Sequence, residues 1–219
     1  MNRHSRNIAI MIAACLLSQA ASAWATVGGP EVATILGWNP VEKRIYYKVN
    51  FVDESGRPPR LYFLDLGSSH PGDAVPHRLW PEEEDPIIDY PSVDSKIETL
   101  RKQLVQLPAS ASDTLVMSIT TRTSQEDWKN TNGDIRSKYE LEILISAESL
   151  KGSARVTSFC NREVLIKEWY KIPELPFALV NVSYTGSPDE TCYARPAVIL
   201  LTAGVEEGKP PKTGGPADD

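Results

Sequence analysis

Residues 37–68, GWNPVEKRIYYKVNFVDESGRPPRLYFLDLGS, contain the clearest structural pattern of this chain. Side chains alternate between two faces along residues 43–51, as the two-residue period of a strand requires. Residues 53–59 contain Gly56 and two prolines, which together favour a turn. Residues 60–66 alternate again. The stretch therefore predicts an antiparallel hairpin with a long loop.

The same stretch resembles one blade of the bacterial TolB-type β-propeller repeat. The matching parts are residues 37–40 before the first strand, residues 44–47 within it and residues 61–66 in the second strand. The turn departs from the repeat, because Val41 and Glu42 stand where the repeat has Asp-Gly. The chain also has no second copy at the period of roughly 40 residues that a propeller needs. The resemblance therefore implies a blade-like hairpin inside another fold and carries no function.

Residues 1–25 have the pattern of a secretory signal peptide. Two arginines precede an apolar run at residues 8–17, and small residues follow at 18–25. The apolar run is too short to span a bilayer. Signal peptidase is expected to cut after Ala23 or Ala25.

A lipoprotein signal is the alternative for the same segment. Residues 12–15, Ile-Ala-Ala-Cys, resemble a lipobox, in which Cys15 would carry the lipid. Both alternatives export the protein, so we expect a periplasmic or extracellular location, either free or anchored at Cys15.

The charge balance is acidic, with 23 Lys and Arg against 29 Asp and Glu, a net charge of −6. Removing residues 1–25 takes away two arginines, which leaves 21 against 29, or −8. An acidic chain without a basic patch is not expected to bind nucleic acid. We predict one exported domain at residues 26–204, without a transmembrane segment, and a disordered tail at residues 205–219.

Two cysteines remain after signal removal, Cys160 and Cys192. In an oxidising compartment the simplest expectation is one structural disulfide, which closes a loop and contributes about 3 to 4 kcal/mol. A redox-active pair is the alternative, although the chain has no Cys-x-x-Cys motif.

Residues 92–107 predict one principal helix. Ser92 can cap its start, apolar residues recur at helical spacing, and Pro108 ends the pattern. The apolar stripe consists of Val93, Ile97, Leu100, Leu104 and Leu107. A single stripe indicates a helix that lies on a sheet.

Strand-like segments account for most of the remaining chain. They are residues 31–38, 114–123, 135–146, 154–160, 164–171, 177–184 and 192–202, and the last four are spaced as in an antiparallel meander. Apolar and charged side chains alternate from Lys138 to Ile145, which predicts a sheet with one solvated side. The chain is therefore expected to be mainly β (α+β), an antiparallel sheet or sandwich with one helix and not a full propeller.

Few titratable groups cluster in the sequence. His70, Asp73 and His77 lie in the proline-rich connection at residues 67–91, where a loop could gather them as metal ligands, or they are solvent-exposed. Residues 82–85 are consecutive carboxylates without the spaced pattern of a calcium loop. The chain has neither a Gly-x-Ser-x-Gly turn nor a glycine-rich phosphate loop, and no cofactor is expected.

Four aromatic residues, Trp128, Trp169, Tyr170 and Tyr184, form either a ligand platform or core packing. Together these patterns favour an exported, non-catalytic binding or accessory protein. The alternative is a hydrolase or metal-dependent enzyme that uses residues 70–90. A third hypothesis is a subunit that pairs the strand edge at residues 60–66 with another envelope protein.

Overall fold

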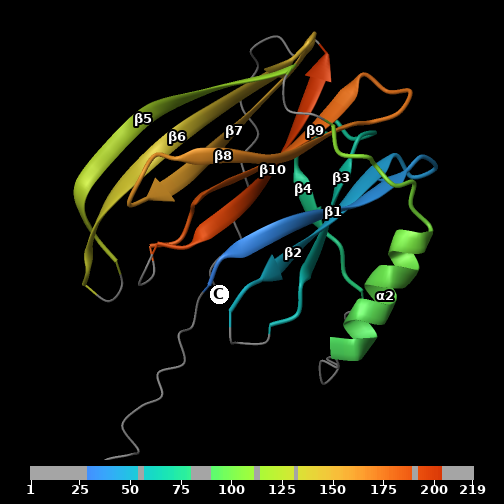
Figure 1. Cartoon of the computed structure of the whole chain (residues 1–219), viewed down its shortest axis with the longest axis horizontal. Helices are drawn as coiled ribbons and strands as arrows, with labels where there is room; N and C mark the ends of the chain where they lie inside the picture. Colours follow the sequence, from blue (N-terminus) through green and yellow to red (C-terminus); the bar gives the residue numbers. More distant parts are fainter. Residues whose placement is uncertain are drawn as a thin grey trace, which may run out of the picture.

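The computed structural model describes residues 29–53, 57–79, 90–110, 114–130, 133–188 and 192–203. In these residues the chain is mainly β, with two antiparallel sheets of four and six strands, one short helix and no closed barrel (Figure 1). The predicted fold class is therefore confirmed.

Sheet A has four strands that follow one another in chain order. They are β1 (Glu31–Asn39), β2 (Arg44–Phe51), β3 (Arg60–Asp65) and β4 (Ala74–Pro76). The predicted hairpin is confirmed as β2 and β3, which pair from Arg44 with Asp65 to Val49 with Arg60. The hypothesis of a free strand edge at residues 60–66 is wrong over residues 62–64, because β4 pairs there.

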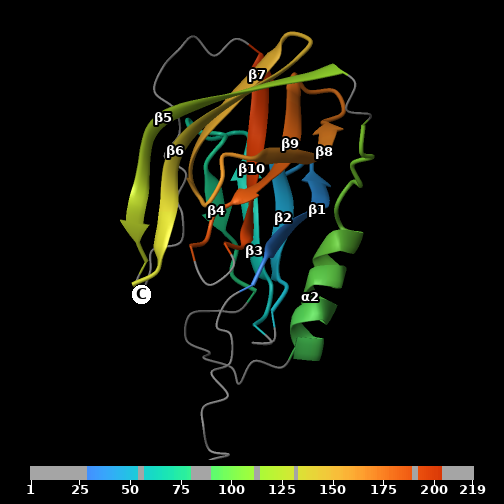
Figure 2. The same ribbon diagram turned by 60° about the vertical axis from the view of Figure 1, so that its left-hand side comes forward.

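The helix α2 (Tyr90–Lys102) lies against the outer face of sheet A (Figure 2). This contact is a cluster of Leu36, Tyr46, Leu61, Val93, Ile97 and Leu104. The predicted end at residue 107 is wrong, because Val105 exchanges two backbone hydrogen bonds of 2.8 and 2.9 Å with Trp38 of β1. Gly37 permits this approach: it has φ +146°, and a Cβ would lie 2.7 Å from the Val105 carbonyl oxygen.

Sheet B has six strands, and their order departs from the predicted meander. They are β5 (Leu115–Lys129), β6 (Ile135–Ala147), β7 (Leu150–Phe159), β8 (Val164–Lys171), β9 (Phe177–Thr185) and β10 (Ala194–Ala203). The spatial order is β5-β6-β7-β10-β9-β8, so β7 is next to β10 and not to β8. β5 also continues past the predicted end at residue 123, since its polar residues keep pairing with β6 as far as Lys129.

The strand β9 lies between two core layers. Ala178, Val180 and Val182 pack in a cluster with β6 and β7, whereas Leu179 packs toward sheet A. Asn181 is only 3% exposed and donates a hydrogen bond of 3.2 Å to the Ala33 carbonyl of β1. The sheets are therefore joined by apolar packing and by one buried amide.

A disulfide joins Cys160, directly after β7, to Cys192, just before β10, with the two Cα atoms 6.4 Å apart. The predicted pairing of these cysteines is present in the structure, and such a bond indicates an oxidising compartment. Among the described residues, no helix combines the length and apolarity needed to span a bilayer.

Candidate functional site

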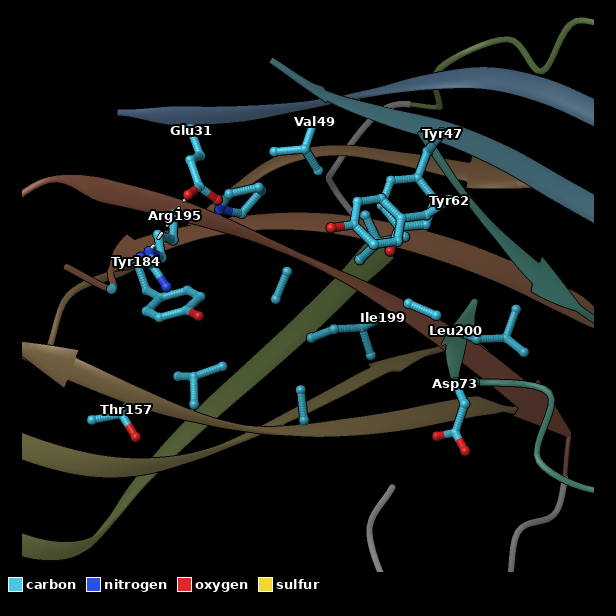
Figure 3. A pocket seen from close by; sticks show the side chains of 18 of the residues that line it. Glu31, Tyr47, Val49, Tyr62, Asp73, Thr157, Tyr184, Arg195, Ile199 and Leu200 are labelled. Carbon is cyan, nitrogen blue, oxygen red and sulfur yellow. Dashed lines mark ion pairs between the residues drawn. The ribbon is translucent and has the colours of Figure 1, made fainter. Parts of the chain in front are cut away.

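β7 and β10 are neighbours that pair over only a small part of their length. The ladder joins Lys151 to Thr202 and Leu150 to Ala203 and then stops. At Gly152 the strands are in close contact, since a Cβ there would lie 2.4 Å from the Leu200 carbonyl oxygen. Figure 3 shows the strands that carry Thr157 and Leu200 converging near Leu200 and separating toward Thr157.

A cavity of about 490 Å³ lies where the two strands separate. Its walls come from the inner face of sheet A and from β6, β7, β9 and β10 of sheet B. The two strands therefore enclose open space here and are not packed against each other.

The sheet A wall is aromatic and aliphatic. Tyr47 and Tyr62 stack with ring centroids 5.3 Å apart and planes inclined by 17°, and Val49 lies beside them (Figure 3). Burial raises the pKa of Tyr47, and the Tyr62 hydroxyl acts in the same direction. The Tyr47 hydroxyl therefore stays neutral at physiological pH.

One end of the cavity carries an ion pair. Arg195 Nε of β10 lies 3.7 Å from a carboxylate oxygen of Glu31 of β1, and Tyr184 lies beneath them (Figure 3). Burial raises the pKa of Tyr184, and the Arg195 charge partly opposes that shift. Lys138 also lines the cavity, with Nζ 3.5 Å from Glu140. The charges at this end are thus largely balanced by neighbours.

The three predicted metal ligands, His70, Asp73 and His77, lie in three separate places. Asp73 lines the cavity at the end opposite Arg195 (Figure 3), whereas His70 is exposed beside Ser69. The His77 ring packs edge-on to Tyr46, 5.3 Å between centroids, and burial lowers its pKa.

Tyr46 belongs to the cluster under α2, so His77 and Asp73 lie on opposite faces of sheet A. Over the part of the chain that the structure describes, no three His, Cys, Asp or Glu side chains are grouped to hold a metal ion. The other candidates, Cys15 and the carboxylates of residues 82–85, lie outside the described residues.

The predicted aromatic platform does not form as one unit. Trp169 and Tyr170 are buried in two different core clusters, and Trp128 packs on Phe159 with centroids 4.9 Å apart. Of the four, Tyr184 alone lines the cavity.

Sequence reasoning missed the residues that build the site. Alternation predicts Tyr47 and Tyr62 only as strand residues, and nothing in their spacing distinguishes the wall of a cavity from a packed core. The mid-strand Pro196 was a usable signal, because proline has no N–H and is confined to strand edges.

No known protein-family model, curated protein or solved structure matches this chain. The resemblance of residues 37–68 to a TolB-type blade therefore stays a prediction.

Proposed function

We propose that this chain is an exported, non-catalytic binding protein whose ligand occupies the cavity between sheet A, β7 and β10. The observation that carries the proposal is the cavity itself. Its volume of about 490 Å³ falls within the range of roughly 300 to 1,000 Å³ that is typical of ligand sites. Apolar and aromatic side chains make up the larger part of its lining, as is typical of such sites, and five charged side chains also line it.

Export is supported by the signal-like pattern of residues 1–25 and by the disulfide. A binding role is supported by how the charges are distributed. Asp73 and the Glu31–Arg195 pair lie at opposite ends of the cavity (Figure 3), whereas catalysis needs titratable groups that converge on one reacting atom.

Native mass spectrometry tests the proposal on the full chain, isolated from its own cell envelope without reductant. We expect a non-covalent adduct that is lost when Thr157→Trp places a large side chain at a cavity-lining position. Arg155→Trp is the matched control, since Arg155 precedes Thr157 by two residues on β7 and does not line the cavity. An adduct that survives Thr157→Trp, or a chain that carries none, would contradict the proposal.

A further inference from the structure

The cavity is bordered by strand edges and not by strand faces. Residues 195–200 of β10 all line it, although successive side chains of a strand point to opposite faces. A run of consecutive lining residues means that the backbone edge borders the space. On β7 the lining residues also come from both faces, because Ser153 and Thr157 alternate with Ala154 and Val156, although Arg155 interrupts the run.

These two edges lack a ladder to each other along the cavity. β10 pairs with β9 on its other side from Ala194 to Thr202, and β7 pairs with β6 along its whole length. Between β7 and β10, the described strands pair only at residues 150 and 151 with 203 and 202. Backbone N–H and C=O groups away from bulk water require hydrogen-bond partners, and an open strand edge is a template for another strand.

Pro196 fits this arrangement. It lies within the part of β10 that borders the cavity and pairs with Ser183 of β9. Because proline is tolerated in a strand where its missing N–H would face an unpaired edge, its position marks the β7 side of β10 as open.

We propose that the cavity takes an extended peptide segment of another polypeptide, which adds as a strand between β7 and β10. This inference rests on the proposed binding function and names its ligand class. Since β7 and β10 are antiparallel, the added segment is antiparallel to one of them and parallel to the other. Main-chain hydrogen bonds give affinity in this mode of recognition, and side-chain pockets give specificity.

The cavity walls define the side chains that the segment carries. Residues of an extended segment point alternately to its two sides. One side meets Tyr47 and Tyr62, and the other meets Ile199 (Figure 3), which belongs to the same core cluster as Val156. The segment therefore has apolar side chains at successive positions on both sides.

Both ends of the gap are closed, by the Gly152 contact at one and by the disulfide at the other. The segment therefore enters sideways. Its length matches the six cavity-lining residues 195–200 of β10, about 20 Å at the rise of a strand.

The test begins with affinity selection from a library of capped hexapeptides on the oxidised full chain. Selected peptides are resynthesised with N-methyl groups at alternate backbone amides, which removes donors and leaves every side chain in place. We expect N-methylation in either alternating phase to weaken binding by about tenfold to a hundredfold, because the amides of one phase donate to β7 and those of the other to β10, and each phase loses two or three hydrogen bonds. Amide hydrogen exchange of residues 156–159 should slow when the unmodified peptide binds.

The variants locate the binding site. Thr157→Trp should abolish peptide binding and Arg155→Trp should retain it, with circular dichroism confirming that both fold. Binding that survives N-methylation in either phase, or unchanged exchange at residues 156–159, would refute strand addition between the two edges while leaving a binding function intact. If no hexapeptide is selected and native mass spectrometry of the envelope-derived chain shows a small molecule, the ligand class is wrong. If no hexapeptide is selected and native mass spectrometry shows no adduct, both the binding function and the peptide ligand are wrong.

Discussion

Removal of the disulfide between Cys160 and Cys192 should lower stability by an amount that follows from its place in the fold. The cysteines are 32 residues apart in the sequence, and the chain-entropy relation for such a loop gives about 3.7 kcal/mol at 25 °C. Among the described residues, few other contacts join these ends of β7 and β10. The ladder lies at the other end, and two hydroxyl hydrogen bonds link this end of β7 to β9 instead: Ser158 donates to the Thr185 carbonyl at 3.1 Å, and Thr185 donates to the Asn161 side-chain oxygen at 3.2 Å. We therefore expect the free energy of unfolding to fall by the full amount that the chain-entropy relation gives.

The double variant Cys160→Ser/Cys192→Ser makes the measurement clean, because it leaves neither cysteine of the pair with a free thiol. For a domain of this size, about 2 to 4 °C of melting temperature is lost per kcal/mol. The variant should therefore melt about 7 to 15 °C below the oxidised wild type, as followed by circular dichroism. Reductant should lower the wild type by the same amount and should leave the variant unchanged.

An unchanged melting temperature in the double variant would refute the reasoning, because it would mean that β7 and β10 are held at this end by other contacts. A further fall of the variant in reductant would also refute it, because the variant has no bond between residues 160 and 192 left to reduce. Urea titration separates a stability change from a change in the unfolded state, since the latter alters the slope.

Three further predictions follow, two on side-chain packing and one on the titration of His77. Ile97→Ala removes a buried side chain between α2 and sheet A and should cost about 2 to 5 kcal/mol in urea unfolding, against less than about 0.5 for exposed Glu98→Ala. Gly152→Ala places a Cβ 2.4 Å from a β10 carbonyl oxygen and should cost about 1 to 3 kcal/mol, whereas Gly72→Ala, with open space around it, should cost little. Burial lowers the pKa of His77 below its usual value of 6.5, so the unfolded chain binds the proton more readily than the folded chain. The free energy of unfolding should therefore stay constant above about pH 6.5 and decrease below it. His77→Phe should remove this pH dependence.

Local signals were sufficient for the elements whose determinants are local. The hairpin of β2 and β3 follows from alternation and from the turn between them, and the burial of Leu141, Ile143 and Ile145 follows from the period of β6. The disulfide follows from composition and compartment. These features need no knowledge of which strand lies beside which.

The remaining features depend on partners distant in the sequence. The helix pattern continues to residue 107, but the chain leaves the helix after Lys102 because Val105 pairs with Trp38 of β1. Similarly, β7 pairs with β10 across two intervening strands, and side-chain periodicity carries no information on strand order. The cavity could not be predicted for the same reason, since it forms only where β7 and β10 lie next to each other and then separate.

Two residues nevertheless mark that separation in the sequence. Gly152 permits β7 to meet β10 where no Cβ would fit, and Pro196 occupies a cavity-lining strand position where no donor toward β7 is needed. In a continuous sheet β7 and β10 would pair along their whole length, and a proline at that position would leave one hydrogen bond of the ladder unmade. Here the backbone contact fixes one end of the gap and the disulfide fixes the other, so the opening is a defined feature of the fold. Another peptide backbone is the partner that best satisfies the N–H and C=O groups of two open strand edges, which is the physical reason for expecting a peptide.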